Sequence, residues 1–432
     1  GEVPEGWDIM PLKHVASLKG RLGWQGLRAD EYTDEGPYLV TSEHFSNERV
    51  DWARCYHVSR ARYAQAPEIQ LRPDDLLMMK DGAAMGKLAY VEFIPGPACL
   101  NSHLLLFRPV GGRFLNRFLF YVLGGPSFES YMTQERTGTT FFGISQESIG
   151  SFRLALPPVE EQHRILELLN REVTRIDTLI ARQERLIELL QEKRQALISH
   201  AVTKGLNPSA PMKPSGVEWL GEVPAHWETK PVKLIARIGN GSTPSRDNPG
   251  YWEDGNYPWL NSSVVNQEAV TEAQEFVTPL ALRECHLPKI VPPAVLMGIT
   301  GQGRTRGMAS TLLFEATINQ HVAYLKPYPR QADVGFLRRV FDMSYTLLRS
   351  ESDGGGSTKG AITCEQIAHL KIPIPPLTEQ VAIAAYLDAE TTKIDVLVAK
   401  VEAAIALMRE HRTALISAAV TGKIDVREPA HA

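Results

Sequence analysis

Side chains able to contact nucleic acid lie in short loops that also contain glycine. Arg, Lys, Gln, Ser and Thr donate hydrogen bonds to base edges and phosphates, and glycine lets a backbone approach a ligand closely. In the second half of the chain these candidates are Thr243, Arg246, Gln302, Arg304, Arg306, Ser357, Thr358 and Lys359. In the first half they are Arg21, Trp24, Lys80, Lys87, Thr139 and Thr140. Each loop could instead be a solvated turn.

Two Asn-x-His triplets stand beside apolar, strand-like runs. Asn101 and His103 occupy the same place in the first half as Asn319 and His321 in the second. Because short polar side chains next to strands often hydrogen-bond to the nearby backbone, we expect a structural role for all four.

No enzymatic signature emerges. The run from Gly82 to Lys87 has too few residues between its glycines for a phosphate loop, and Gly301 to Gly307 does not fit the dinucleotide fingerprint. No Asn/Asp-Pro-Pro-Tyr/Phe tetrapeptide occurs, as an adenine methyltransferase would need, and no metal-spaced carboxylate or Ser/His/Asp cluster stands out. We therefore expect no catalytic residue, metal or cofactor on this chain.

Composition indicates a cytoplasmic globular protein but does not by itself suggest DNA. The 432 residues are 43% hydrophobic and 22% charged, with a net charge of −4, so contacts with DNA would have to come from local patches. The four cysteines are far apart, which suits a reducing compartment. No apolar run reaches the length of a membrane helix, and no signal peptide is visible.

The chain is an internal duplication. Gly1-Glu2-Val3-Pro4 with Trp7 returns as Gly221-Glu222-Val223-Pro224 with Trp227. In the second copy this motif follows residues 215–220, so we expect some native residues to be missing before Gly1. From Pro157 to Thr203 about half of the positions are identical to those starting at Pro375.

Each copy ends in a long helix. Residues 159–204 contain no Pro or Gly, and their apolar residues follow alternating steps of three and four, which is typical of a coiled-coil seam. The second copy repeats the pattern through Leu387, Ile394 and Ile405. Each helix would be about 65–70 Å long and would need a partner, for which the other helix is the nearest candidate. An ordinary amphipathic bundle helix is the alternative.

The fold class expected is α+β, with two pseudo-symmetric globular domains on two long helices. The expected parts are globular domain 1 (1–153), helix 1 (154–205), a linker (206–220), globular domain 2 (221–371), helix 2 (372–424) and a tail (425–432). The globular domains match poorly between the copies whereas the helices match well. This contrast indicates a common scaffold that carries two different binding domains.

The motifs resemble one known family. Pro-Pro-x-x-Glu-Gln leads into a helix that ends Leu197-Ile198-Ser199-His200-Ala201-Val202-Thr203, and this is repeated as Leu415-Ile416-Ser417-Ala418-Ala419-Val420-Thr421. Val217-Glu218-Trp219-Leu220 precedes the second Gly-Glu-Val-Pro. With the duplication, these motifs resemble the specificity subunit of type I restriction–modification enzymes over essentially the whole chain.

The resemblance implies two target-recognition domains on antiparallel helices, each reading one half of a bipartite site in double-stranded DNA. It implies partners: two methyltransferase subunits that use S-adenosylmethionine to methylate adenine at N6 and, in restricting systems, motor-nuclease subunits. The helices would set the spacer and dock the methyltransferase. The alternatives are a protein-binding coiled-coil scaffold, an enzyme with an unfamiliar site, and a specificity subunit of a modification-only system. The sequence does not give the target bases.

Overall fold

The computed structural model describes residues 3–21, 27, 29–137, 143–301, 303–353 and 360–426. It divides into two compact units. Unit 1 comprises Gly1–Glu184 with Glu402–Ala432, and unit 2 comprises Arg185–Val401. Each unit therefore holds one globular domain, part of the helix that follows it, and part of the other long helix.

The globular domain of unit 1 is built on two sheets. The first has the strand order β2-β10-β7-β8-β5-β4 and the second β6-β3-β9, while β1 pairs with β11 alone. The strand bounds are β1 Asp8–Pro11, β2 Ala16–Gly20, β3 Tyr32–Val40, β4 Phe45–Ser46, β5 Arg49–Val50, β6 Tyr56–Val58, β7 Leu76–Met79, β8 Leu88–Tyr90, β9 Ala98–Leu100, β10 Leu104–Pro109 and β11 Arg153–Leu156. The short helices are α1 Arg60–Ala64, α2 Asn116–Leu123, α3 Pro126–Glu135 and α4 Gln146–Ser151.

Unit 2 repeats this topology. Its sheets are β15-β22-β19-β20-β17 and β18-β16-β21, with β14 paired to β23 and a separate hairpin β12-β13. The strand bounds are β12 Met212–Pro214, β13 Glu222–Pro224, β14 Glu228–Pro231, β15 Ala236–Asn240, β16 Tyr257–Leu260, β17 Ala269–Val270, β18 Glu275–Val277, β19 Ala294–Gly298, β20 Ala309–Leu312, β21 Thr317–Ile318, β22 Val322–Pro327 and β23 Lys371–Ile374. The helices are α6 Pro279–Glu284, α7 Val334–Asp353 and α8 Cys364–His369. Since strand order follows the duplication although the sequences diverge, the two domains share one fold.

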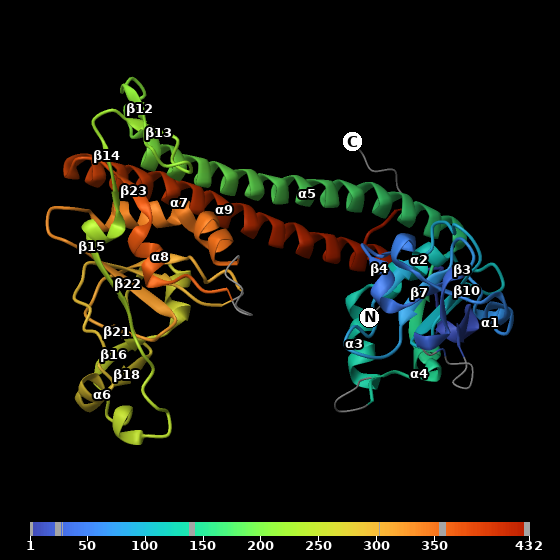
Figure 1. Ribbon diagram of the computed structural model, residues 1–432. Coiled ribbons are helices and arrows are strands. Elements are labelled where there is room, and N and C mark those ends of the chain that lie inside the picture. The colour runs from blue at the N-terminus through green and yellow to red at the C-terminus, as the bar shows by residue number, and fades with distance from the viewer. Residues whose placement is uncertain are drawn as a thin grey trace. The chain divides into compact units, whose positions relative to one another are not determined.

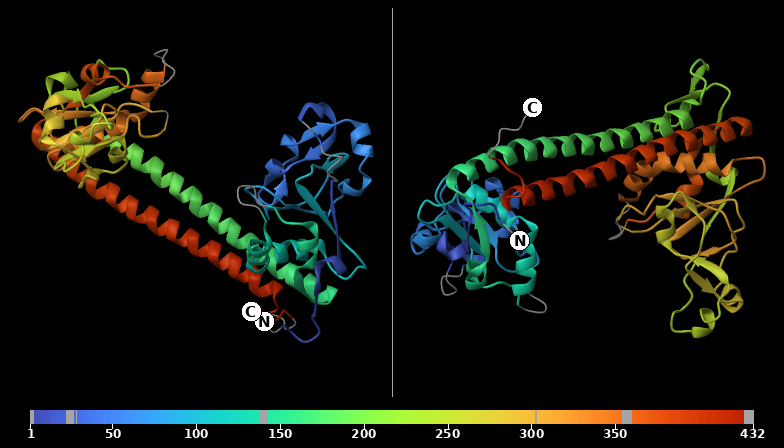
Figure 2. Two further views of the ribbon diagram at one scale, coloured as in Figure 1. Left: turned by 90° about the horizontal axis from the view of Figure 1, so that it is seen from below. Right: turned by 180° about the vertical axis from the view of Figure 1, so that it is seen from behind.

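The long helices are α5, Val159–Lys204, and α9, Leu377–Val420. Part of α5 lies beside part of α9 in each unit, as Figures 1 and 2 show in green and red. The pairing is antiparallel in unit 1, because Asp177 pairs with Arg412 while Glu184 pairs with the earlier Arg409. In unit 2, Arg194 likewise contacts Asp395.

The apolar stripe expected along each long helix is buried over part of its length and half-buried elsewhere, as at Ile187 and Val398. Its members in unit 1, such as Leu169 and Ile176, are buried, as are Leu387 and Ile394 in unit 2. In each unit the seam joins the core of the globular domain, which in unit 1 includes Trp7.

The expected start of each helix was wrong. Residues 154–156 and 372–374, assigned to the helices, belong to strands β11 and β23. These strands pair with β1 and β14, and Pro-Pro follows each before the helix begins. The expected end of the second helix, 424, was also late, because α9 ends at Val420.

Candidate nucleic-acid interface

Three segments of unit 1 that carry candidate residues meet beyond the end of β7. The Lys80 backbone N–H donates to the His103 carbonyl over 3.0 Å, and the Ile144 N–H donates to the Lys80 carbonyl over 3.0 Å. Asp81 forms an isolated β-bridge with Gly143. The loop after β7, the turn before β10 and the segment before α4 are therefore held together by the backbone.

Unit 2 brings the equivalent segments together in the same way. The Ile299 N–H donates to the His321 carbonyl over 2.9 Å, and the Ile362 N–H donates to the Ile299 carbonyl over 2.8 Å. The loop that carries Arg304 is thus fixed beside the turn that carries His321. The loop after β15 joins them, because Thr243 Oγ1 donates to Gln320 Oε1 over 2.5 Å.

The candidates that are not buried differ in exposure and in whether their charged groups already make hydrogen bonds. Arg304 is exposed, and its carbonyl accepts a hydrogen bond from the Tyr345 hydroxyl. Lys87 is exposed as a residue, but its Nζ donates to the Phe45 carbonyl over 2.8 Å. Lys80 is half-buried. Arg304 is therefore the better placed of these three to meet a phosphate or a base.

Arg246 is exposed but already has partners. Its Nη2 lies 2.7 Å from Glu275 Oε1, and its guanidinium stacks over the Trp252 ring at 3.7 Å from the ring centre. A guanidinium held by a carboxylate and an indole organises its own loop. Contact with DNA would require it to share or leave these partners.

Two expected DNA contacts need correction because the side chains are buried. Arg21 is 3% exposed, and its Nε donates to the Leu100 carbonyl over 2.9 Å. Burial lowers the pKa of this guanidinium, although the neighbouring Cys99 opposes the shift. Arg306 is also 3% exposed. Neither side chain is at the surface, where a base edge would have to meet it.

Seven candidates lie outside the described residues. They are Trp24, Thr139, Thr140, Gln302, Ser357, Thr358 and Lys359. Their contact with DNA remains a prediction from sequence.

The structural role expected for the Asn-x-His triplets is confirmed for the asparagines. Asn101 Oδ1 accepts the His103 backbone N–H over 3.1 Å, and Asn319 Oδ1 accepts that of His321 over 2.9 Å. The histidines face the loops after β7 and β19. His103 Nδ1 lies 2.7 Å from Asp81 Oδ1, and His321 Nδ1 lies 2.7 Å from Thr300 Oγ1.

Sequence reasoning missed a polar hollow in unit 2. A cavity of about 230 Å³ follows β16 and is lined largely by amides and acids, among them Asn261, Asn266, Gln267 and Gln274. Asn266 Oδ1 accepts a hydrogen bond from Thr305 Oγ1 over 3.2 Å, which places the hollow beside the Arg304 loop. Asn and Gln are the residues that pair with adenine edges. The sequence signal that could have found it is the number of Asn and Gln residues in 261–274. This segment contains no glycine, Arg or Lys, which were the residues used to choose candidate loops.

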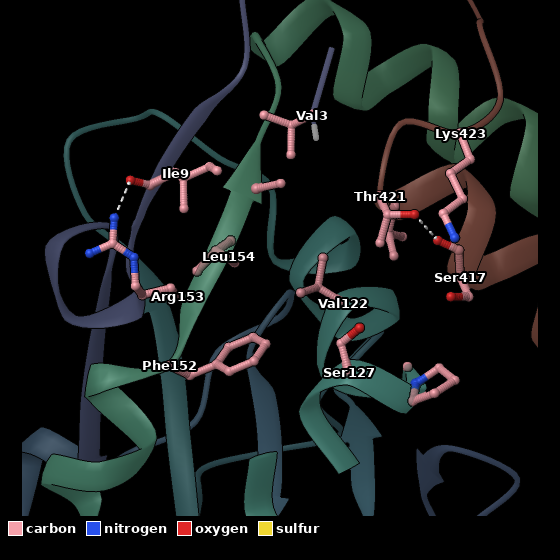
Figure 3. A pocket seen from close by; sticks show the side chains of 14 residues that line it. Val3, Ile9, Val122, Ser127, Phe152, Arg153, Leu154, Ser417, Thr421 and Lys423 are labelled. Atoms are coloured by element: carbon pink, nitrogen blue, oxygen red, sulfur yellow. Dashed lines mark hydrogen bonds between the residues drawn. The ribbon is translucent and has the colours of Figure 1, made fainter. Parts of the chain in front are cut away.

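A larger cavity, of about 380 Å³, lies where the end of α9 meets β1 and β11 in unit 1. Figure 3 shows Val3, Ile9 and Leu154 facing Thr421 across it. Its walls are mainly aliphatic, and the Thr421 hydroxyl donates to the Ser417 carbonyl in the helix. The cavity lies between segments from the two ends of the sequence. Its lining residues do not group acids with bases as a catalytic site would.

Within the described residues no three His, Cys, Asp or Glu side chains are grouped as a metal site. The same residues include no helix long and apolar enough to cross a membrane.

Comparison with known families decides the assignment. The sequence pattern described as "Type I restriction modification DNA specificity domain" matches residues 4–189 and again residues 224–405. The chain belongs to this family. The two matches correspond to the two copies, so this specificity subunit carries two such domains.

Curated relatives match along almost the entire chain. The type I restriction enzyme MjaX specificity subunit of Methanocaldococcus jannaschii is 25% identical, over 99% of this chain and 96% of its own. The MjaVIII specificity subunit of the same organism is 22% identical, over 98% and 94%. These relatives are named as specificity subunits, which agrees with the family resemblance expected from the repeated motifs.

Solved structures support the fold. A chain from a type I R-M system superposes with a TM-score of 0.73 at 17% identity, covering 98% of this specificity subunit and 100% of that chain. The HsdS subunit from Thermoanaerobacter tengcongensis gives a TM-score of 0.56 at 17% identity, with 98% and 99% covered. The α+β fold with two domains is therefore established.

Proposed function

We propose that this specificity subunit is a cytoplasmic, non-catalytic protein that directs a methyltransferase to a bipartite target in double-stranded DNA. Each globular domain reads one half-site. One observation carries the proposal: two domains with the same strand order gather different polar loops at the same place in each unit. A shared scaffold with unlike loops suits two different half-sites better than a single symmetric one.

The proposal includes two copies of a methyltransferase subunit docked on the long helices. Exposed leucines recur there at equivalent places, Leu179 and Leu407 in unit 1 and Leu397 and Leu189 in unit 2. Their exposed fractions are 38%, 66%, 48% and 46%, on helices that also have a buried apolar face. A repeated apolar surface supports two copies of one partner. S-adenosylmethionine would be bound by that partner, and a motor-nuclease subunit would join in a restricting system.

The test is reconstitution with the cognate methyltransferase subunit. We expect the purified chain alone to transfer no methyl group, and the mixture to place N6-methyladenine at one split sequence in genomic DNA read by long-read sequencing. Methyl transfer by the chain alone would refute the non-catalytic assignment. Methylation that is independent of this chain would favour a protein-binding scaffold.

A modification-only system would lack only the motor-nuclease subunit. Adding a cognate motor-nuclease subunit and ATP to the reconstituted complex should give cleavage of unmethylated target DNA. If the complex methylates its target but recruits no such subunit, the solitary modification system is the correct version of the proposal.

A further inference from the structure

Arg412 joins three separate parts of unit 1. It lies on α9, and its Nε is 2.9 Å from Oδ1 of Asp177 on α5. Its Nη2 is 3.4 Å from Oε2 of Glu48, in the globular domain. The Arg412 side chain is 23% exposed, and the Glu48 and Asp177 side chains are 50% and 49% exposed. One guanidinium therefore connects both long helices to the globular domain.

Arg194 makes the same three-way connection in unit 2. It lies on α5, and its Nη2 is 2.7 Å from Oε1 of Glu268 in the globular domain. Its Nε is 3.5 Å from Oδ1 of Asp395 on α9. The roles of the two helices are exchanged between the units, and the three charges are of the same types.

The helix residues of this connection come from the duplication. Arg194 and Arg412 each stand two residues before an Ala-Leu-Ile-Ser run, and Asp177 and Asp395 each follow the isoleucine of an Ile-Asp pair. The helices retain much of their common sequence, so this recurrence alone would be unremarkable.

The acidic residues recur within domains that have otherwise diverged. Glu48 stands directly before β5, and Glu268 stands directly before β17. These short strands occupy equivalent places, because β5 pairs in parallel with β8 and β17 in parallel with β20. A glutamate therefore occupies the equivalent sheet position in both units, and in both it faces the arginine.

The backbone of Glu48 is fixed to the sheet. It and Asn47 form the turn between β4 and β5, with φ values of 62° and 49°, a left-handed conformation that non-glycine residues rarely adopt. The Glu48 carbonyl accepts the Tyr90 backbone N–H over 2.9 Å. Because the turn is fixed to the sheet, the backbone of Glu48 moves with the domain.

Glu268 is held by more partners. Its carbonyl accepts hydrogen bonds from the Thr311 N–H and from Arg338 Nη1. Its carboxylate also lies 3.2 Å from Arg338 Nη2 and 3.3 Å from Arg339 Nη1. Burial would raise the pKa of Glu268, but these arginines together with Arg194 hold it below its ordinary value.

We propose that Arg412 and Arg194 are positioning residues that fix the angle of each globular domain on the helix pair, and so determine how strictly the spacer between half-sites is measured. The proposal rests on the proposed function. Apolar packing resists separation of a domain from the helices, but it has little directionality. Ion pairs to both helices restrain rotation, and a rotated domain would meet its half-site at a different place along the duplex.

The units should respond unequally. Glu48 is tied to the helices by Arg412, whereas the domain of unit 2 is tied to α9 also by Arg339, whose Nη2 lies 2.6 Å from Oδ1 of Asp388. Loss of Arg412 should therefore release the domain of unit 1 more than loss of Arg194 releases that of unit 2.

The experiment uses the full chain with its cognate methyltransferase and duplexes that carry both half-sites, taken from the wild-type methylation map. The spacer is native, one base pair shorter or one base pair longer. We expect Arg412→Gln to raise the rate at altered spacers, relative to the native spacer, by about fivefold or more. Arg194→Gln should raise that ratio less.

Arg409→Gln is the matched control. Arg409 also lies on α9 and its Nη2 pairs with Glu184 of α5 at 2.9 Å, so it joins the same helices through an exposed ion pair. It should leave the spacer ratio unchanged.

A merely structural role would lower melting temperature and reduce the rate at all spacers by one factor. An unchanged spacer ratio in Arg412→Gln and in the milder Glu48→Gln would overturn the inference. If the wild-type complex directs no methylation to a split site, the proposed function itself fails. The wild-type measurement therefore distinguishes failure of the proposed function from failure of the positioning role.

Discussion

The indole Nε1 of Trp227 donates a hydrogen bond to Oε2 of Glu379 over 2.9 Å. In unit 1, Trp7 Nε1 donates to Glu161 Oε1 over 3.0 Å. Each glutamate lies in the first turn of a long helix, where a negative charge is favourable. The bond satisfies the polar atom of a tryptophan that is packed in the core, and so joins each domain to the start of its own helix.

Glu379→Ala should destabilise the protein by about 1–3 kcal/mol, because it leaves the indole N–H of a buried tryptophan without its charged acceptor. Urea unfolding measures the change in the free energy of unfolding. Glu410→Ala, an exposed position on the same helix, is the matched control for helix propensity. Equal losses in the two variants would show that the hydrogen bond contributes nothing.

Gly205→Ala should cost more than Gly216→Ala. Both glycines have positive φ, 75° and 73°, so alanine is strained at either place by about 1–2 kcal/mol. A β-carbon on Gly205 would lie 3.1 Å from the Trp227 ring, whereas one on Gly216 meets nothing within 4 Å. The difference between their unfolding free energies isolates the contact at the end of α5, and no difference would mean that Trp227 shifts freely.

The duplication made the scaffold predictable from sequence. Heptad spacing predicted both long helices and the apolar face of each. The same reasoning began the helices too early, because β11 is a strand only through its pairing with β1 across the domain. Pairing at that sequence distance leaves no local signal.

The candidate site was less predictable. Arg21 and Arg306 stand among glycines and polar residues, as surface arginines do, yet both are buried. The contact of Arg412 with Glu48 joins residues 364 positions apart, in different copies. Neither burial nor such a contact follows from the residue types alone, since each depends on the path of the whole chain.

Acidification should weaken unit 1 through His44. This side chain is 1% exposed, and its Nδ1 accepts the Thr41 backbone N–H over 3.1 Å, so the folded protein requires neutral imidazole. Burial lowers the pKa of His44, partly offset by Glu43 and Asp51, while Arg54 adds to the lowering.

Because the folded pKa lies below the unfolded value of about 6.5, the unfolded state binds the proton first and stability falls as pH decreases below that value. His44→Gln should show a smaller loss of unfolding free energy between about pH 7 and pH 5. His14→Gln, at an exposed position of the same unit, is the control. A slope in His44→Gln as steep as that of the wild type would contradict the assignment.

Removing Arg339 while its acidic partners remain should destabilise the protein. Arg339 is 1% exposed, and its Nη2 donates to Asp388 over 2.6 Å and to Thr391 over 3.1 Å. Burial raises the pKa of the neighbouring Asp342, against the effect of Arg338 and Arg339. Arg339→Met should therefore destabilise by about 3 kcal/mol, because it leaves acidic groups without their cation.

Adding Asp342→Asn should recover part of that loss, since it removes one of the uncompensated charges. Arg237→Met, at an exposed position of the same unit, should have little effect. If the double variant is as unstable as the sum of its single changes, Arg339 and Asp342 are not coupled.

Alanine substitutions of Arg304 and of Arg306 should have different effects. Arg304 is exposed on the loop beside the amide hollow, so Arg304→Ala should weaken DNA binding by the complex and reduce the slope of log affinity against log salt by about 1. Arg306 is 3% exposed, so Arg306→Ala should lower the melting temperature and leave that slope unchanged. Fluorescence anisotropy at several salt concentrations measures the slopes. An unaltered isotherm for Arg304→Ala would remove the 303–307 loop from the interface.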